Sequence, residues 1–278
     1  MTRFTLVPAL ALLLLLTGCG NSGPKPWLGY AEGEDAFIGA PQPGWIASIA
    51  VKRGDVVKKG EVLFTLDDTQ QLALRDEAKA ALAQARAQLE QAQAKLAYAT
   101  KELHRQRKLV HAHAGTKSAL DLAQNNYDET AAQISQIKAQ ERAAKATLDN
   151  AEYQLSQRKI TARVSGRVED IYFRIGEYVP ASTPVISLLP PQNVFVRFFV
   201  PEKQFAKVKM GQSVHISCDN CAKNLIAKIT FIAQQEEFTP PVIFSIANRD
   251  KLVFKLEARA KGGLALNPGQ PVDVSPMQ

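Results

Sequence analysis

The sequence lacks the motifs by which enzymes are most often identified. It contains no Gly-x-Ser-x-Gly nucleophile turn, no Gly-x-x-x-x-Gly-Lys phosphate loop and no cluster of metal-ligating residues. Its net charge is +7, but the longest basic block is Arg105-Gln106-Arg107-Lys108, and no aromatic residues alternate with the basic ones. A base-stacking nucleic-acid surface would need that alternation. We therefore expect no catalysis, no cofactor, no bound metal and no nucleic-acid partner.

Long apolar runs are also scarce, and the one that occurs lies at the N-terminus. Arg3 is followed by the apolar stretch 9–16 and then by Leu16-Thr17-Gly18-Cys19. This order is typical of a secretory signal peptide, and the run is too short to cross the roughly 30 Å core of a bilayer. The last four residues resemble the lipobox of bacterial lipoproteins, whose cysteine is acylated. We predict a signal peptide over residues 1–18 and a lipid on Cys19, followed by a lipid-linked linker to residue 36; a plain secretory signal is the alternative.

Only two other cysteines occur, Cys218 and Cys221. An even pair in an exported chain favours a disulfide. A thioredoxin-like site would need a helix N-terminus to lower the thiol pKa, whereas the preceding residues alternate as in a strand. A zinc site would need two more ligands, and His215 is the only nearby candidate. We predict a structural disulfide across a hairpin turn, with a redox motif or half of a zinc site as alternatives.

Two segments lying 122 residues apart share one pattern. Residues 44–57 and 166–179 both alternate apolar and polar residues between glycines. The coinciding positions are Gly44 and Gly166, Ile46 and Val168, Ile49 and Ile171, Gly54 and Gly176, Asp55 and Glu177, Val57 and Val179, and Leu66 and Leu188. We predict structural turn glycines at Gly44, Gly54, Gly60, Gly166 and Gly176, where turns need a positive φ. Short alternating strands cannot bury a core alone, so the two halves should pack together.

The first segment resembles the biotinyl/lipoyl domain superfamily. The resemblance rests on Gly54-Asp55-Val56-Val57-Lys58-Lys59-Gly60 and on Leu63-Phe64-Thr65-Leu66. In carrier members of that superfamily a modified lysine follows in a tight hairpin. Here Gln70 stands at that position, and a glutamine has no nucleophilic amine to acylate. The resemblance therefore implies the fold and disfavours a swinging-arm carrier.

A long helical hairpin is predicted in place of the carrier's tight turn. No proline occurs between Thr69 and Val179. Apolar or small residues recur in heptads, at Leu82, Leu89, Leu96, Leu103 and Val110 in the first arm and at Leu120, Tyr127, Ile134, Leu148 and Leu155 in the second, with alanines between them. Such heptads specify a coiled coil. We predict an antiparallel hairpin over residues 69–158, with arms of roughly 60 Å and a tip near 111–118.

Two details of this hairpin depend on single residues. Gly115 is expected to end the first helix, and Thr116 or Ser118 to cap the second. Glu141 interrupts the apolar seam, so it either extends outward to solvent or pairs with a basic residue of the other arm. The histidines His111 and His113 are read as solvated turn residues, because their i,i+2 spacing does not place them on one helix face.

A β-domain split by a long hairpin resembles the HlyD-type membrane-fusion, or periplasmic adaptor, proteins. In members that dock onto TolC-type outer-membrane channels, the tip carries an Arg-x-x-x-Leu-x-x-x-x-x-x-Ser motif. Arg105, Leu109 and Thr116 have that spacing here, with threonine in place of serine. The resemblance implies that they dock onto the channel. The alternative is that these residues have no docking role. Arg105 is then a solvated helix residue, Leu109 packs within the hairpin, and Thr116 only caps the second helix.

The C-terminal third is predicted to form a small β-barrel over residues 191–278. Strand-like runs lie at 194–200, 213–218, 227–233 and 252–258, and Pro, Gly and Asn separate them. The segment Glu237-Phe238-Thr239-Pro240, together with Arg249 and the run 252–256, resembles adaptors that serve ABC-type exporters.

The predicted fold is therefore a multidomain α+β chain. A split lipoyl-like barrel-sandwich hybrid (37–68 and 159–190) is interrupted by the hairpin and followed by the barrel. The resemblance implies a tripartite efflux or secretion system in which this chain, as a homo-oligomer of six copies, links an inner-membrane transporter to a TolC-like channel. We expect it in the periplasm, lipid-anchored at the inner membrane. A structural coiled-coil envelope lipoprotein, or an adaptor of an RND- or MFS-type pump, is the alternative.

Overall fold

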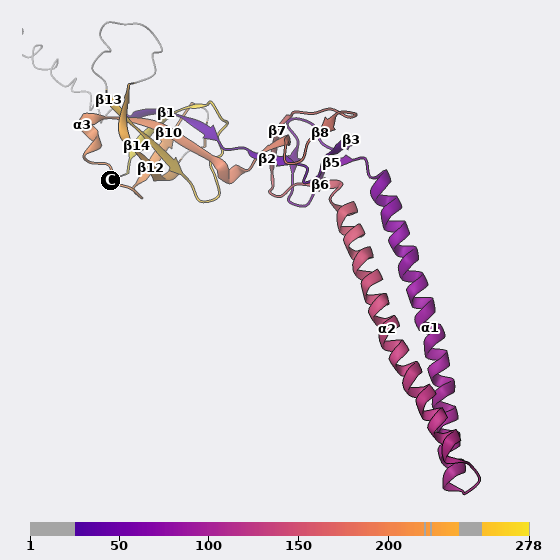
Figure 1. The fold of residues 1–278 in the computed structure, drawn as a ribbon. Helices are drawn as coiled ribbons and strands as arrows, with labels where there is room; N and C mark the ends of the chain where they lie inside the picture. Colours follow the sequence, from indigo (N-terminus) through magenta and orange to yellow (C-terminus); the bar gives the residue numbers. More distant parts are fainter. Residues whose placement is uncertain (1–25, 220, 223, 239–251, 278) are drawn as a thin grey trace, which may run out of the picture. The chain divides into compact units, whose positions relative to one another are not determined.

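The computed structural model of the chain describes residues 26–277 except 220, 223 and 239–251. It divides into two compact units (Figure 1). Asp35–Pro190 form the first unit, which contains a β-domain and the helical hairpin. The described residues before and after that range form the second unit, a closed β-barrel. This architecture confirms the predicted fold class.

The β-domain of the first unit consists of two four-stranded sheets. Their orders are β2-β9-β7-β4 and β6-β5-β3-β8. The strands are β2 (Ala36–Gly39), β3 (Gly44–Ile49), β4 (Val56–Val57), β5 (Val62–Leu66), β6 (Lys159–Thr161), β7 (Gly166–Ile171), β8 (Tyr178–Val179) and β9 (Pro184–Leu189). An offset of 122 residues carries β3 onto β7, β4 onto β8 and β5 onto β9, and it brings β2 onto β6. Each sheet therefore takes two strands from each half of the repeat.

The two halves are joined by matching hydrogen bonds. The backbone N–H of Gly54 donates to the carbonyl oxygen of Val168 at 2.8 Å, and the N–H of Gly176 donates to the carbonyl oxygen of Ile46, also at 2.8 Å. These two bonds are related by the same offset. Between the sheets lies one apolar core, to which both halves contribute; its fully enclosed members include Val57, Leu63, Phe64, Val179, Val185, Ile186 and Leu188. Neither half can complete this core alone.

Three of the five predicted turn glycines adopt the left-handed backbone conformation. Gly54, Gly60 and Gly176 have φ values of 90°, 91° and 86°. The acidic residue after each of them accepts a hydrogen bond within the same turn: Asp55 Oδ2 from the N–H of Lys52 at 2.8 Å, Glu61 Oε2 from the N–H of Lys58 at 2.9 Å, and Glu177 Oε2 from the N–H of Arg174 at 2.9 Å. The recurring glycine–acid pair in the sequence therefore builds three similar turns.

Gly44 and Gly166 were predicted as turn glycines, and this prediction is wrong. Each is the first residue of a strand, and neither has a positive φ. Both glycines instead leave room for an atom of another residue that approaches closely. A Cβ at Gly166 would lie 2.7 Å from the carbonyl oxygen of Leu189, and one at Gly44 would lie 2.7 Å from a guanidinium nitrogen of Arg158. Strand glycines often mark such close approaches.

The hairpin consists of α1 (Thr69–His111) and α2 (Lys117–Ser156), which run side by side (Figure 1). The predicted heptad positions face the partner helix. The residues buried between the helices are Ala78, Leu82, Ala85, Ala92, Ala99 and Leu103 of α1 and Ala123, Thr130 and Ile134 of α2. Alanines dominate this set, so the two backbones can approach closely. The helices are thus held by a narrow seam, and most other side chains on them are exposed.

The exception in the seam, Glu141, pairs across the hairpin. Its Oε1 accepts a hydrogen bond from Arg86 Nε at 3.3 Å. Of the two possibilities left open by the sequence, an ion pair with the opposite arm is therefore the one that the structure contains. Because both side chains are partly exposed, the pair contributes on the order of 1 kcal/mol or less.

The second unit is a six-stranded closed barrel in the order β1-β10-β13-β12-β11-β14. Its strands are β1 (Trp27–Gly33), β10 (Val194–Pro201), β11 (Ser213–Ser217), β12 (Leu225–Phe238), β13 (Leu252–Arg259) and β14 (Pro271–Pro276), with the short helix α3 (Glu202–Phe205) after β10. Residues 19–36 were expected to form a linker, but β1 lies in that range. It closes the barrel by pairing with β10 and β14.

Substitutions at two equivalent turn positions, Gly60 and Ser182, test the repeat. Ser182 lies 122 residues after Gly60 and has a φ of 61°, so serine occupies a left-handed position that glycine fills in the first half. We expect Gly60→Ser to lower the free energy of unfolding by about 1 kcal/mol, because a side chain is strained there while no neighbour lies within 4 Å of the added Cβ. Ser182→Gly should be neutral or stabilising. Urea unfolding of both variants measures these effects. An unchanged free energy of unfolding for Gly60→Ser would contradict the prediction.

Candidate functional site

The outer end of the hairpin is a tight turn between the two helices. The N–H of Ala112 donates to the carbonyl oxygen of Lys108 at 3.0 Å, and the N–H of Ala114 donates to that of Leu109 at 2.9 Å. His113, with a φ of 55°, is the left-handed residue of the turn. The chain is thereby folded back over the last turn of α1.

Gly115 does not end the first helix as predicted. α1 already ends at His111, and the left-handed position falls to His113. Gly115 instead allows the returning chain to pass close to α1. A Cβ at this position would lie 3.0 Å from the Cβ of Leu109 and 3.1 Å from the backbone nitrogen of Val110. Glycine therefore makes room here for a close approach of the two segments, and it does not end the helix.

Thr116 is the N-cap of α2. Its Oγ1 accepts a hydrogen bond from the N–H of Ala119 at 3.2 Å, and its extended backbone (φ −100°, ψ 149°) is typical of an N-cap. The bond satisfies one of the N–H groups that a helix start leaves without a partner. Of the two capping candidates in the sequence, Thr116 is the one that caps.

Arg105 and Leu109 lie one helical turn apart on α1, and both are exposed. The side chain of Arg105 is 66% exposed, and one of its guanidinium nitrogens contacts Glu102 Oε2 at 2.5 Å. Hydrogen bonds donated by Gln106 and by Arg105 hold the pKa of Glu102 below its usual range. The carboxylate thus stays charged and orients the guanidinium. Glu102 was not among the residues predicted for this site, although its i,i+3 spacing from Arg105 is a signal for such a pair.

Positive charge is concentrated at this end of the hairpin. Between residues 101 and 118 there are five basic residues (Lys101, Arg105, Arg107, Lys108 and Lys117) and one acidic residue (Glu102), so the net charge is +4 with the histidines neutral. The remainder of the two helices contains seven basic and nine acidic residues. Among the described residues, Arg105 alone of these five cations has an acidic partner within ion-pair distance. Lys108 also complements the C-terminal end of the α1 dipole.

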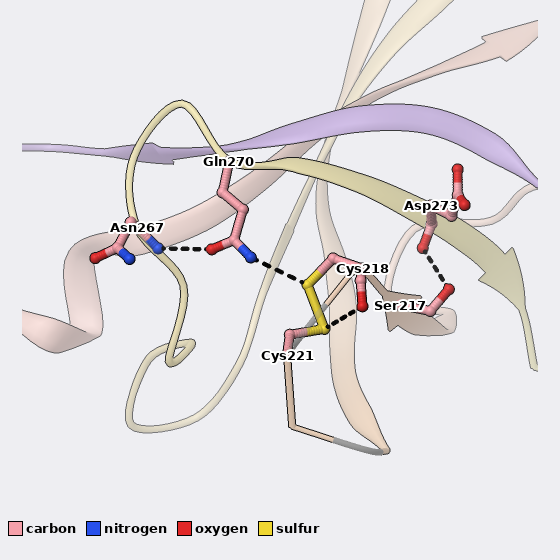
Figure 2. The surroundings of a disulfide bond; sticks show 6 residues. All are labelled: Ser217, Cys218, Cys221, Asn267, Gln270 and Asp273. Atoms are coloured by element: carbon pink, nitrogen blue, oxygen red, sulfur yellow. Dashed lines mark hydrogen bonds between the residues drawn. A yellow bond between two sulfur atoms is a disulfide. The ribbon is translucent and has the colours of Figure 1, made fainter.

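The structure places the Cys218–Cys221 pair in the β11–β12 connection of the barrel. The two sulfurs are joined in a disulfide, with Cα atoms 5.5 Å apart. Figure 2 shows Gln270, which precedes β14, directed at this bond: its Nε2 lies 3.4 Å from Cys218 Sγ, and its Oε1 accepts from the N–H of Asn267 at 3.2 Å. The disulfide therefore closes the connection between β11 and β12, and Gln270 links that connection to the loop that leads into β14.

Other predicted sites lie elsewhere or outside the described residues. Cys19, the predicted lipid attachment point, precedes the described range, and Thr239, Pro240 and Arg249 of the motif resembling ABC-exporter adaptors fall in the gap at 239–251. None of the described helices combines the length and the apolar character that a membrane span needs. Within the described residues, no three His, Cys, Asp or Glu side chains converge as metal ligands would.

Comparison with known proteins points to one kind of protein. A family model described as the α-helical hairpin domain of RND MFP proteins matches residues 81–158. YdhJ of Escherichia coli (strain K12) is 29% identical over 214 residues, which are 76% of this chain and 69% of that protein. The macrolide export protein MacA of Escherichia coli O157:H7 is 32% identical over 178 residues, which are 63% of this chain and 48% of that protein.

The fold has a counterpart among solved structures. The crystal structure of MacA from Actinobacillus actinomycetemcomitans superposes with a TM-score of 0.67, covering 92% of this chain and 80% of that one, at 22% sequence identity. At that identity the likeness concerns the fold. The chain spans about half to two thirds of the length of the two relatives given above.

The cap at Thr116 can be tested separately from any partner. We expect Thr116→Val, which keeps the shape but removes the hydroxyl, to lower the free energy of unfolding by about 1 kcal/mol. Thr116→Ser keeps the oxygen and should unfold as the wild type does. Circular dichroism at 222 nm during thermal unfolding measures both. An unchanged valine variant would mean that the cap does not stabilise α2.

Proposed function

Because the chain belongs, broadly, to the HlyD-type membrane fusion proteins, we propose that it is a periplasmic adaptor that links an inner-membrane transporter to a TolC-like outer-membrane channel. The observation that carries the proposal is the outer end of the hairpin. Arg105, Leu109 and Thr116 have the spacing of the channel-docking motif; Leu109 and Thr116 flank one tight turn, and Arg105 lies one helical turn before Leu109. A long two-helix arm with a small, exposed end is suited to reach a distant partner.

The local geometry supports docking by all three residues. Leu109 is exposed although the returning chain packs against its Cβ, so its position is held while its outer face is free for contact. The carboxylate of Glu102 restrains Arg105, and an incoming acceptor would compete with it. Thr116 uses its oxygen as a helix cap, which leaves its methyl group for contact. Docking would then combine an apolar contact with a charge-assisted hydrogen bond.

In the same proposal a lipid on Cys19 holds the protein at the inner membrane, and the barrel meets the transporter. Several acyl chains, each CH₂ worth about 0.8 kcal/mol when buried, would anchor the chain firmly. An ABC-type transporter is the partner class we favour, on the resemblance of the segment around Phe238-Thr239-Pro240; an RND- or MFS-type pump is the alternative. The adaptor itself performs no chemistry, so the energy for export comes from the transporter.

Six copies are proposed to surround a sealed conduit through their lipoyl-like domains. This domain exposes two pairs of aromatic side chains that would suit contacts between copies. Trp45 and Tyr178 pack edge to face with ring centroids 5.3 Å apart, and Phe37 and Tyr172 lie 6.4 Å apart. Exposed aromatic residues are enriched at protein–protein interfaces. A structural envelope lipoprotein with the same hairpin, not part of a pump, is the second candidate function.

Photocrosslinking in cells tests the docking step. With a photoreactive residue at Leu109 or at Ala112, we expect adducts with an outer-membrane channel protein. Arg105→Asp should reduce them at least tenfold, because the substitution reverses the charge that faces the channel. A probe at Thr147, far along α2, is the control and should give no channel adduct. Good expression without adducts from either tip position would remove the docking proposal and favour the envelope lipoprotein.

The lipid anchor has its own test. We expect the full-length protein to incorporate radiolabelled palmitate and to fractionate with membranes. Cys19→Ala should abolish labelling and release the protein into the soluble fraction, because the acylated thiol is lost. Cys218→Ala, which leaves Cys19 in place, is the matched control and should still be labelled. Membrane retention of an unlabelled Cys19→Ala variant would contradict anchoring by lipid alone.

A further inference from the structure

A pocket of about 500 Å³ opens in the first unit, beside the point where α2 meets the β-domain. Small-molecule sites have volumes of roughly 300–1,000 Å³. One side of the pocket is lined by β2 and Pro41, and the other by the end of α2, β6 and Arg163. All of its lining residues belong to one compact unit. The docking site at the hairpin tip includes none of them. We call it the hairpin-base pocket.

The hairpin-base pocket lies between the edges of the two sheets. β2 is the end strand of one sheet and pairs with β9, and β6 is the end strand of the other and pairs with β5. Because β2 and β6 do not pair with each other, the sandwich is open between them. Ile38 and Ile160, which are 7% and 6% exposed, line the pocket and also belong to the apolar core. They provide an apolar floor.

The repeat explains why the two walls of the pocket differ. Three pairs of lining residues are equivalent under the offset of 122: Ile38 and Ile160, Phe37 and Lys159, and Pro41 and Arg163. The first pair is apolar in both halves and forms the floor. In each of the other two pairs, an apolar residue of the first half is replaced by a cation in the second half. The pocket therefore has an apolar wall opposite a cationic wall.

The charged side chains that line the pocket are all positive. Lys159 and Arg163 are exposed, and none of the lining residues is acidic. Neither cation has an acidic group within ion-pair distance among the described residues. Lys159 also borders a neighbouring pocket that contains Asp68, but Arg158 lines that pocket as well and offsets the carboxylate.

The C-terminal end of α2 does not reverse this charge. A helix end of this kind carries about half a negative charge, on carbonyl groups that lack a partner. Here Ser156 Oγ and the N–H of Gln157 donate to the carbonyl oxygen of Tyr153 at 2.6 and 3.2 Å, and the N–H of Arg158 donates to that of Leu155 at 3.0 Å. The two full positive charges of the cationic wall are therefore the larger contribution.

We propose that the hairpin-base pocket binds a small amphipathic anion, an apolar body that carries one carboxylate or sulfonate group. The apolar part lies on Ile38 and Ile160, beside Phe37. The anionic group accepts charge-assisted hydrogen bonds from Lys159 and Arg163, and arginine can donate two parallel bonds to such a group. Since the pocket is separate from the hairpin tip, this site does not depend on docking to a channel.

Fluorescence titration with anilinonaphthalene sulfonate, an aromatic amphipathic anion, tests the site. The sample is the full-length protein in a nonionic detergent, and protein-free micelles are the blank. We expect saturable binding that Lys159→Gln/Arg163→Gln weakens at least tenfold. The matched control Lys52→Gln/Arg174→Gln also removes one lysine and one arginine. Both are exposed on the same β-domain and are equivalent under the repeat, but they lie outside the pocket. The control should stay within twofold of wild type.

Phenylnaphthylamine, which has the same rings without the sulfonate, separates charge from apolar contact. We expect it to bind the wild type at least fivefold more weakly than the sulfonate does. Lys159→Gln/Arg163→Gln should leave its affinity within twofold of wild type, because the apolar floor is intact. Raising the salt concentration should weaken binding of the sulfonate only, since exposed charges are screened. An equal loss of both probes in the variant would mean that the cations do not select the anion.

The remaining outcomes would also overturn the inference. Unchanged binding of the sulfonate to Lys159→Gln/Arg163→Gln would show that these cations do not contact the ligand. An equal loss in Lys52→Gln/Arg174→Gln would assign binding to surface charge in general. A signal no greater than the blank would show that the pocket takes no such ligand. Binding to the monomer but not to the oligomer, after separation by sedimentation, would show that a second copy fills the pocket.

A photoreactive carboxylate locates the site directly. After irradiation with benzoylbenzoate, we expect mass spectrometry to find the label within residues 36–41 or 156–163, and an excess of the sulfonate probe to prevent it. Label spread over the hairpin or the barrel, or label that the sulfonate does not displace, would contradict the assignment.

Discussion

The pairing of β5 with β6 is the constraint on which the rest of the first unit depends. These strands come from different halves of the repeat, and their register sets Phe64 opposite Ile160. α1 begins three residues after β5, and α2 ends three residues before β6. The pair therefore brings the two ends of an insertion of about ninety residues together, and the helices leave the β-domain as neighbours. Without this pairing the alanine seam would have to close the hairpin alone.

The β5–β6 pair is itself held by the interlocking of the two halves. Each sheet combines strands from both halves, and reciprocal hydrogen bonds, such as those of Gly54 and Gly176, cross between them. Removing either half would leave both sheets incomplete and the shared core open. Such mutual dependence makes the folding of the domain cooperative although a long segment separates its parts. It also explains why the insertion is tolerated, because the cost of closing a long loop grows only slowly with its length.

Much of the outer hairpin follows from helical periodicity acting on this frame. The seam uses alanine, so the interface is narrow and both flanks stay accessible. The turn then favours a small residue at Gly115, because the chain passes within contact distance of Leu109. The exposed end thus combines a fixed backbone with free side chains. That combination favours recognition, since less conformational freedom is lost when a partner binds.

The sequence by itself determined the repeat, the heptads and the class of fold, because these depend on local periodicity and on spacing. It also pointed to Thr116 or Ser118 as the cap of the second helix and to Glu141 as an exception. Only the tertiary structure decided that β1 closes the barrel, that Gly44 and Gly166 make room for Arg158 and for the backbone of Leu189, and that Glu141 pairs with Arg86. The physical reason is that a strand partner, a close approach or a shared face is a relation between distant residues, and local pattern carries no information about it.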